Sequence, residues 1–396
     1  MISFPPRLLW LLTLALLVPP NAPGDEKKEA PAIRHQVVYH KKGRFGGWPA
    51  NHGIWSWGDE ILFGFSAAHF KDYEGSTHAV DRKKPEHHLL ARSLDGGETW
   101  TVTDPSEKGV MVPRGAMLMG KPLPGVDIPP LRQLNEAIDF THPGLALTFR
   151  MEDYRGGGQS RFYFSYDRGK NWNGPFALPL FGTPGIGART DYIVNGPHDL
   201  MAFLSAGKTD GKTGRTLCVQ TKNGGVSWEF VSWIGPEPEG YHVMPSSVRL
   251  NEKELLTVIR VSSKPLAAYH SPDNGKTWDL RCDAVAMTGL RSRTNPPSLL
   301  KLQDGRLAVV YGYRAKPYGL RASFSSDDGR TWGGEVILRD DGASWDIGYP
   351  RSVQRPDGKV VSVYYYHDKA QGPEPYIAGT IWDPARVTAE KTAPQQ

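Results

Sequence analysis

A pattern of eight residues, Ser-x-Asp-x-Gly-x-Thr-Trp, recurs five times along the 396 residues of this chain and restricts the folds open to it. The copies are SLDGGETW at Ser93, SYDRGKNW at Ser165, TKNGGVSW at Thr221, SPDNGKTW at Ser271 and SSDDGRTW at Ser325. Successive copies start 50 to 72 residues apart, a spacing that suits the four-stranded blades of a β-propeller. One blade for each copy is the simplest interpretation.

The residue types of this box favour a tight turn followed by a buried aromatic ring. An Asp side chain can accept hydrogen bonds from backbone N–H groups two residues on, and Gly adopts positive φ without steric cost. The closing Trp would bury its ring between neighbouring sheets while its indole N–H finds an acceptor. Five unrelated hairpins are the alternative, but they would not all place a Trp at the same position.

A second element, made of a short strand, a polar turn and an apolar strand, precedes each box and occurs once more after the last one. Its six copies begin near Gly53, Leu145, Tyr192, Ser247, Ser298 and Ser352. The sixth copy lacks a box and offers three strands. We therefore predict an all-β fold, a six-bladed β-propeller over residues 34–386. The segment HQVVYH at His35 supplies the missing strand by pairing with the strand around Ile377, which removes an exposed edge.

The N-terminal end has the pattern of a secretion signal. Arg7 precedes an apolar run from Leu8 to Val18, long enough for the core of a signal peptide and too short to span a bilayer comfortably. We predict a signal peptide over residues 1–24, a linker over 25–33 and a polar tail over 387–396, with the protein secreted or periplasmic. An uncleaved anchor is the alternative.

The charge of the chain limits the kinds of partner it can bind, and its two cysteines indicate whether it has a disulfide. A net charge of +5 without a lysine run gives little support for nucleic-acid binding and is compatible with an anionic ligand. Cys218 and Cys282 fall in apolar strands of different repeats. We expect two buried free thiols, with a disulfide as the alternative.

Propeller topology separates the boxes on one face from the residues that precede each inner strand on the other, where propellers usually bind ligands. Many arginines fall on this second face. Guanidinium groups grip carboxylates bidentately and repel one another unless an anion or neighbouring acids neutralise them, so the set favours an anionic ligand. Pairing with Asp139, Asp191 or Asp346 is the alternative for a single Arg. The same face also carries His78, Asp72 and Glu74 in a long loop, Trp48, Asn51, Tyr241, Arg150, Arg291 and Asn295.

With its five boxes the chain resembles the sialidase (neuraminidase) superfamily. The resemblance implies an exo-glycosidase that cleaves a terminal acidic sugar of the sialic acid class from glycoconjugates, with retention, a Tyr nucleophile and neither metal nor cofactor. We expect a monomer that binds an acidic glycan, with no nucleic-acid partner and no membrane span after signal cleavage.

Tyr349 has the register of the family's nucleophile, because it stands shortly before the Asp357-Gly358 turn of the last repeat. A neutral phenol can approach an anomeric carbon that bears a carboxylate, whereas an anionic carboxylate nucleophile would be repelled. A phenol with a pKa near 10 needs an adjacent carboxylate as its base.

Other family roles are assigned by position. Arg260 ends the strand LLTVIR and matches the family's second substrate-carboxylate Arg, and Asp81 lies in the loop that carries its acid/base Asp. Arg44 lies near the first Arg, although FGGWP replaces the usual Arg-Ile-Pro. The remaining candidate substrate-binding residues are Arg293 and Arg314, which compete for the third Arg, together with Arg189 and Asp191.

The chain departs from the family where sialidases place a Glu, because it has Met244-Pro245-Ser246 there. We predict that the preceding loop brings Glu239 within hydrogen-bond reach of the Tyr349 hydroxyl. Two alternatives stay open. One is a non-catalytic propeller that binds acidic glycans or protein, and the other is an enzyme on another acidic polysaccharide that uses His142, His242 or Asp191 for proton transfer.

Overall fold

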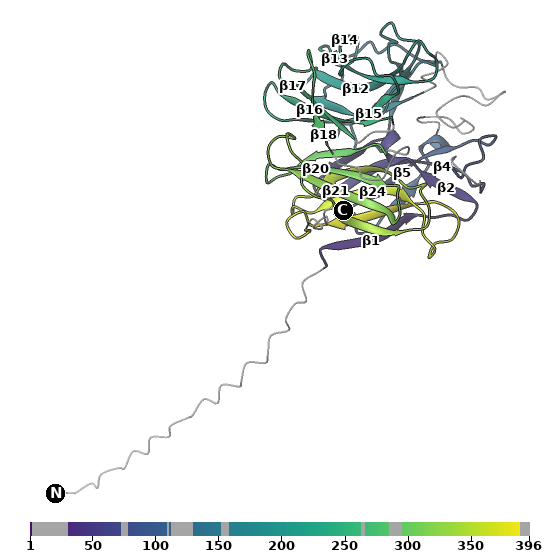
Figure 1. Ribbon diagram of the computed structural model, residues 1–396, viewed down its shortest axis with the longest axis vertical. Coiled ribbons are helices and arrows are strands. Elements are labelled where there is room, and N and C mark those ends of the chain that lie inside the picture. The colour runs from purple at the N-terminus through teal and green to yellow at the C-terminus, as the bar shows by residue number, and fades with distance from the viewer. Residues whose placement is uncertain are drawn as a thin grey trace, which may run out of the picture. The chain divides into compact units, whose positions relative to one another are not determined.

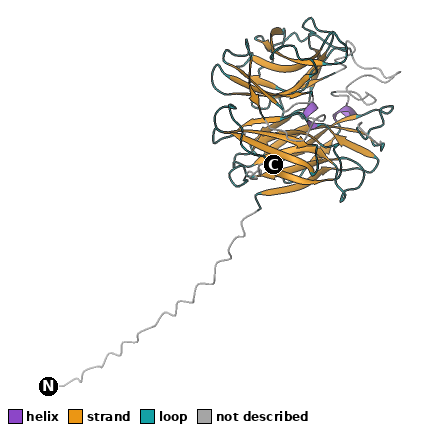
Figure 2. Ribbon diagram, in the orientation of Figure 1, coloured by secondary structure: helices purple, strands orange, loops and turns teal. Residues whose placement is uncertain are grey.

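The computed structural model describes Met1 and residues 31–72, 78–108, 111, 130–151, 158–262, 266–284 and 295–388. The chain divides into two units, Met1–Pro31 and Ala32–Gln396. Apart from Met1, the predicted signal peptide lies outside the described residues. Strands dominate the second unit, and helix is limited to the short turns η1 (Pro49–Asn51) and η2 (Pro105–Lys108) among the residues described (Figure 2). In the same ranges no helix has the length and apolar character needed to cross a membrane.

The strands of the second unit form six antiparallel sheets, which confirms the predicted six-bladed propeller. The first blade contains β2 (Arg44–Gly47), β3 (Ile54–Trp57), β4 (Glu60–His69), β5 (His87–Ser93) and β6 (Thr101–Thr103). The second contains β7 (Ala146–Arg150), β8 (Arg161–Ser165) and β9 (Asn173–Ala177). The third contains β10 (Ile186–Gly187), β11 (Tyr192–Val194), β12 (Leu200–Gly207), β13 (Gly214–Thr221) and β14 (Glu229–Trp233).

The fourth blade contains β15 (His242–Arg249), β16 (Leu255–Val261), β17 (Ala267–Ser271) and β18 (Asp279–Asp283). The fifth contains β19 (Ser298–Lys301), β20 (Leu307–Tyr313), β21 (Tyr318–Ser325) and β22 (Val336–Gly342). The sixth contains β23 (Gly348–Gln354), β24 (Val360–Tyr366), β25 (Tyr376–Trp382) and β1 (Ile33–Tyr39). The expectation of four strands per blade is met in the fourth, fifth and sixth blades, whereas the first and third have five strands and the described residues of the second form three.

The two ends of the propeller share the sixth blade, as predicted. β1 pairs antiparallel with β25, so that Val37 lies opposite Ala378 and Tyr39 opposite Ile377. Figure 1 shows β1, drawn in purple, beside the C-terminal strands drawn in green and yellow. The N–H of Gly46 in the first blade also donates to the carbonyl of Pro375, at 2.8 Å. The ring is therefore closed by hydrogen bonds between the ends of one chain.

In each of the first five blades, a box forms the expected turn before the last strand. In the first box, Asp95 accepts hydrogen bonds from the Glu98 and Thr99 N–H groups at 3.1 and 2.9 Å and from the Thr99 hydroxyl at 2.6 Å. Burial acts to raise the pKa of Asp95, but these bonds outweigh it and lower the pKa to about 2. The Trp100 indole donates to the Gly97 carbonyl at 3.1 Å. The buried indole N–H groups of Trp228 and Trp332 are exceptions, because they have no acceptor among the described residues.

The cysteines agree with the expectation of free thiols, because Cys218 and Cys282 form no disulfide. Cys218 is buried between strands, whereas Cys282 is only partly buried, so the prediction of two buried thiols is wrong for Cys282.

Three innermost strands are interrupted where they approach the propeller axis. Trp48, Met244 and Tyr349 each precede a Pro and have φ of 58°, 59° and 54°, in the left-handed region that side chains other than Gly rarely occupy. The pairing register of β15 shifts between Val243 and Ser246. A register shift of this kind bends a strand and changes the direction of its side chains. The three side chains consequently meet in one buried cluster.

Candidate functional site

Tyr349 belongs to this cluster, with 6% of its surface exposed. Asn295 fixes its backbone, because the Asn295 Oδ1 accepts the Tyr349 N–H at 2.6 Å and its Nδ2 donates to the Ile347 carbonyl at 2.9 Å. Gly348 precedes Tyr349 with φ of 105°, and a Cβ at that position would come within 2.4 Å of Asn295 Oδ1. The Gly, the Asn and the left-handed Tyr therefore form one local structure that holds the phenol in place.

Three arginines from three blades surround the Tyr349 phenol. Arg260, on β16, donates from Nη1 to the Tyr349 hydroxyl at 3.1 Å. Arg314, which follows β20, has its Cζ 5.6 Å from the centre of the Tyr349 ring. Arg189, which follows β10, is buried and donates from Nε to the Asn51 Oδ1 at 2.5 Å. Burial acts to raise the pKa of Tyr349, but the charges of Arg260, Arg314 and Arg189 outweigh it and hold this pKa below its usual value.

Aromatic rings form the walls around the arginines. The Cζ of Arg260 lies 5.3 Å from the ring centre of Tyr241, and the Cζ of Arg314 lies 5.3 Å from that of Trp345. The ring centres of Trp48 and Tyr365 are 6.5 Å apart. Trp48 and Tyr365 are buried, whereas the partly exposed rings of Tyr241 and Trp345 can pack against the apolar faces of a sugar while the charges bind its anionic group.

A histidine and an aspartate form a pair next to Tyr349. The Nδ1 of His78 lies 2.5 Å from the Oδ1 of Asp346, which also accepts the Tyr365 hydroxyl at 2.7 Å. The Ala79 N–H donates to the Oδ2 of Asp346 at 3.2 Å. Burial acts to raise the pKa of Asp346, but His78, Arg314 and the Tyr365 hydroxyl keep it below its usual value. Asp346 is therefore an anion held by several partners.

Four of the candidate site residues from the sequence are brought together, namely Tyr349, Arg260, Arg314 and Arg189. Asp191 lies close in sequence to Arg189 but bonds elsewhere, because it accepts the N–H and hydroxyl of Ser247 at 3.2 and 2.8 Å. Arg293, the competitor of Arg314, lies outside the described residues.

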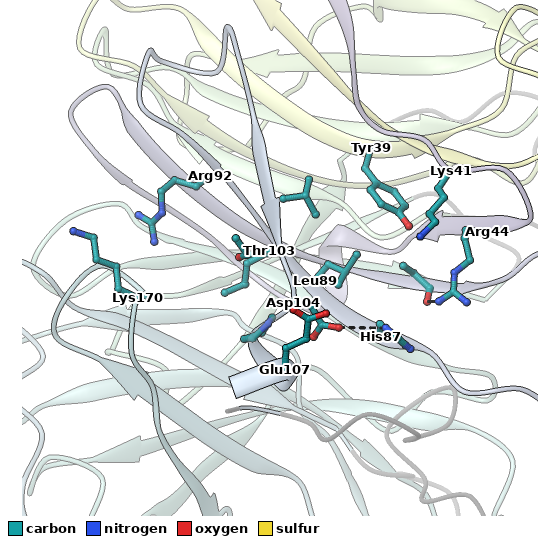
Figure 3. A pocket seen from close by; sticks show the side chains of 15 residues that line it. Tyr39, Lys41, Arg44, His87, Leu89, Arg92, Thr103, Asp104, Glu107 and Lys170 are labelled. Carbon is teal, nitrogen blue, oxygen red and sulfur yellow. Dashed lines mark hydrogen bonds and ion pairs between the residues drawn. The ribbon is translucent and has the colours of Figure 1, made fainter. Parts of the chain in front are cut away.

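Arg44 bonds away from the Tyr349 phenol. Its Nη2 donates to the Ala67 carbonyl at 2.7 Å, and the side chain lines a separate pocket of about 730 Å³. Figure 3 shows this pocket, in which His87 and Asp104 form an ion pair at 3.3 Å. Its lining includes none of the three arginines Arg260, Arg314 and Arg189.

The two residues expected to transfer protons, Asp81 and Glu239, do not bond Tyr349. Asp81 accepts the Lys83 N–H at 3.1 Å and lies 3.8 Å from the Lys84 Nζ. Glu239 is exposed, and across the described ranges it makes no hydrogen bond to Tyr349. The expected contact between Glu239 and the Tyr349 hydroxyl is thus not formed, because the side chain points to solvent and Arg260 bonds the hydroxyl instead.

Met244 fills the position at which the family resemblance places a Glu. Its Sδ lies 3.4 Å from the Arg260 Nη1, so an uncharged thioether contacts the guanidinium group at this position. His142 packs on Tyr166, with ring centres 4.4 Å apart, and His242 lies 6.2 Å from Tyr269.

Sequence reasoning placed His78 and Asp346 on the correct face without assigning them a role, and it did not consider Trp345 or Tyr365. Their proximity depends on a long loop of the first blade that reaches the sixth. The repeated X-Pro dipeptides at Trp48, Met244 and Tyr349 are a signal that could have identified the interrupted inner strands, because a residue before Pro is restricted in its backbone angles.

Comparison with known proteins agrees with the fold. A family model described as BNR repeat-like domain matches residues 145–361. A crystal structure of a Dyadobacter fermentans protein of unknown function is similar, with a TM-score of 0.64, 21% identity and coverage of 89% of this chain and 99% of that one.

Two sialidase structures are similar at 12% identity, with 89% of this chain covered. The NanB sialidase of Streptococcus pneumoniae has a TM-score of 0.57 and 71% of its chain covered. The Trypanosoma rangeli sialidase in complex with the inhibitor DANA has a TM-score of 0.57 and 60% of its chain covered. No curated protein matches. At these identities the likeness concerns the fold alone.

Proposed function

Because this chain belongs to the BNR repeat-like domain family and folds as a propeller of the sialidase superfamily, we propose that it hydrolyses glycosides whose terminal sugar bears a carboxylate. The observation that supports this proposal is the convergence of Arg260, Arg314 and Arg189 on the buried hydroxyl of Tyr349. Arg260 and Arg314 are the candidate carboxylate ligands, and Tyr349 is the candidate nucleophile.

The charge of the site favours an anionic ligand. Arg314 donates hydrogen bonds to two neutral groups, the Ile347 carbonyl at 3.0 Å and the Tyr365 hydroxyl at 2.7 Å, and Asp346 is the anion near it. Bringing several guanidinium groups together at low exposure is costly unless an anion compensates them. A carboxylate on the sugar can do so, because it matches the fork of donors on each guanidinium.

The same charges can replace a base for Tyr349. A phenol at its ordinary pKa is a weak nucleophile at neutral pH, and an adjacent carboxylate would normally activate it. Here Met244 stands in that place, and the arginines favour the phenolate form directly. A bound carboxylate offsets part of the positive charge of the arginines. Arg260 donates to the Tyr349 hydroxyl itself and therefore contributes most to the ionisation of the phenol.

The proposed reaction takes place in two displacements at one carbon. The phenolate oxygen of Tyr349 bonds to the anomeric carbon while the bond from that carbon to the glycosidic oxygen breaks, and the departing oxygen takes up a proton. Water then attacks the anomeric carbon and loses a proton, and the bond to Tyr349 breaks to restore the phenolate. Two displacements retain the anomeric configuration.

A non-catalytic propeller that binds acidic glycans is the second candidate. The replacement of the family Glu by Met244 favours it, because without proton transfer the arginines and aromatic rings form a binding site only. Export of the protein and a monomeric state also belong to the proposal, and export rests on the apolar run from Leu8 to Val18.

The first prediction separates the two candidates. The purified protein is tested for hydrolysis of 4-nitrophenyl glycosides of sialic acid, glucuronic acid and glucose, and free sialic acid binding is measured by calorimetry. Tyr349→Phe should abolish hydrolysis and leave sialic acid bound, because it removes the nucleophile and keeps the arginines that bind the carboxylate. Arg260→Ala should weaken binding by about 1.5 to 3 kcal/mol, as is typical of a charge-assisted pair.

Arg330→Ala is the matched control, because Arg330 is exposed and pairs with Asp328 at 3.9 Å outside the cluster. It should bind like the wild type. Binding without hydrolysis would establish the second candidate, and a wild type that neither binds nor hydrolyses an acidic sugar would refute both.

A further inference from the structure

The proposed hydrolysis requires a group that gives a proton to the departing oxygen and takes one from water. The position that the family resemblance gives to this group is Asp81, which is bonded to its own loop at the Lys83 N–H. Glu239, the other predicted carboxylate, is exposed. A different residue must therefore transfer the proton.

We propose that His78 is the acid/base residue of this site and that Asp346 orients it. This assignment rests on the proposed function, because it needs Tyr349 as the nucleophile. The ring centres of His78 and Tyr349 lie 6.3 Å apart with their planes at 80°. The two rings are therefore close neighbours, as two groups that act on one glycosidic bond must be.

The hydrogen bond to Asp346 leaves one nitrogen of His78 available. Nδ1 is taken by Asp346, and Nε2 has no partner among the residues that the structure describes. The His78 side chain is 23% exposed, whereas that of Asp346 is 7% exposed. A buried carboxylate on Nδ1 holds the proton there in the neutral imidazole, so that Nε2 can accept a proton or donate one when charged.

Asp346 is itself held in a fixed position. It accepts the Tyr365 hydroxyl and the Ala79 N–H in addition to His78. The ring of His78 packs edge-on against that of Trp48, at 5.3 Å between centres. These contacts orient the imidazole from two sides, which is the arrangement that a general acid and base requires.

The proton balance closes with His78 in both displacements. In the first, the charged imidazole gives its Nε2 proton to the glycosidic oxygen as the bond to the anomeric carbon breaks and the phenolate oxygen of Tyr349 bonds to that carbon. In the second, the neutral Nε2 takes a proton from water as the water oxygen bonds to the anomeric carbon and the electron pair returns to Tyr349. After the second displacement, Tyr349 is again a phenolate and His78 is again charged.

The test compares substrates that differ only in the leaving group. A 4-nitrophenolate departs without help, whereas methanol needs a proton. His78→Gln should therefore lower kcat/KM for the methyl glycoside of sialic acid by about 100-fold to 10,000-fold, the usual contribution of general acid catalysis. For the 4-nitrophenyl glycoside the loss in the first displacement should stay below about tenfold.

His87→Gln is the control, because His87 also lies at the edge of the first blade and pairs with a carboxylate, Asp104, but outside the Tyr349 cluster. It should match the wild type on both substrates. Asp346→Asn changes a residue that positions His78. It should show the same dependence on the leaving group as His78→Gln, because the amide can donate to Nδ1 of His78 and so move the imidazole proton to Nε2. If it fails to fold, His78→Gln on the partly exposed ring still decides the question.

Equal losses on both substrates, or none, in His78→Gln would overturn the assignment and leave the proposed function intact. A wild type that hydrolyses neither sialoside would instead refute both the assignment and hydrolysis of sialosides.

Discussion

Asn295, Gly348 and Tyr349 show how a single side chain is aimed in this propeller. The left-handed backbone of Tyr349 carries a conformational cost of about 1 to 3 kcal/mol, which the hydrogen bond from the Tyr349 N–H to Asn295 and the packing of the ring offset. Trp48 and Met244 have the same conformation at equivalent breaks of their strands. Such strain concentrates where side chains must point to a common place.

The sequence indicated the identity of Tyr349 and Arg260 but not their contacts. The position of each residue within its repeat can be read from the spacing of the sequence. The residue that bonds the Tyr349 hydroxyl depends instead on how loops from other blades are placed. The predicted contact with Glu239 required a loop to fold back, and no local pattern specifies that. Met244 was recognised as a departure from the family, but its contact with Arg260 came only from the structure.

The pKa of Asp191 yields a prediction for stability. Burial raises this pKa to about 7, although Arg351 and the hydrogen bonds from Ser247 act against it. A folded pKa above the unfolded value of about 3.9 means that the folded protein binds the proton more tightly. Asp191 therefore costs stability at neutral pH, and this cost is relieved as the pH falls from about 7 towards 4.

The free energy of unfolding of Asp191→Asn should accordingly rise relative to that of the wild type as the pH rises from 4.5 to 7.5. The slope should be at most about 1.4 kcal/mol per pH unit, and it is measured by urea unfolding of both proteins. A difference between the two proteins that does not change with pH would contradict the raised pKa.

At the scale of the element, the boxes were predictable because they depend on bonds within eight residues. The side chain of Asp95 and the carbonyl of Gly97 satisfy the turn locally, so the pattern survives in five different surroundings. The box also contacts the preceding blade. A Cβ on Gly275 of the fourth blade would lie 2.7 Å from the Met201 Cε and 3.1 Å from the Cys218 Sγ of the third.

Gly275→Ala should therefore destabilise the protein more than Gly305→Ala. Both positions have positive φ, of 80° and 88°, but nothing lies within 4 Å of a Cβ at Gly305. Gly305→Ala should cost about 1 kcal/mol of the free energy of unfolding through backbone strain alone, and Gly275→Ala about 1 to 3 kcal/mol more through overpacking. Urea unfolding measures both costs, and equal values would show that packing of the box against the preceding blade does not contribute to stability.

At the scale of the whole molecule, the number of blades and the closure of the ring were predicted from counting repeats and strands. This succeeded because the sixth repeat lacked a strand that the N-terminal segment could supply. The absence of a fourth described strand in the second blade was not foreseen, because the apolar pattern near Leu145 resembles that of the other blades.

Removal of β1 should open the ring. A protein that begins at Lys41 lacks the strand opposite β25 and exposes the edge of β25, so we expect its melting temperature to fall by at least about 10 °C or the protein to aggregate. A protein that begins at Ala32 keeps β1 and is the control, which should melt like the full chain. Scanning calorimetry compares the three, and equal melting temperatures would show that closure by β1 contributes nothing.

The pairing of β1 with β25 also sets an order of events during synthesis. The ribosome makes β1 first and β25 last, so the sixth sheet cannot be completed until the chain has emerged to Trp382. Contacts between residues so far apart in sequence form late and slow the folding of a domain. During translation β1 therefore remains an unpaired strand, and this is the interval in which the nascent protein is open to pairing with another chain or to capture by a chaperone.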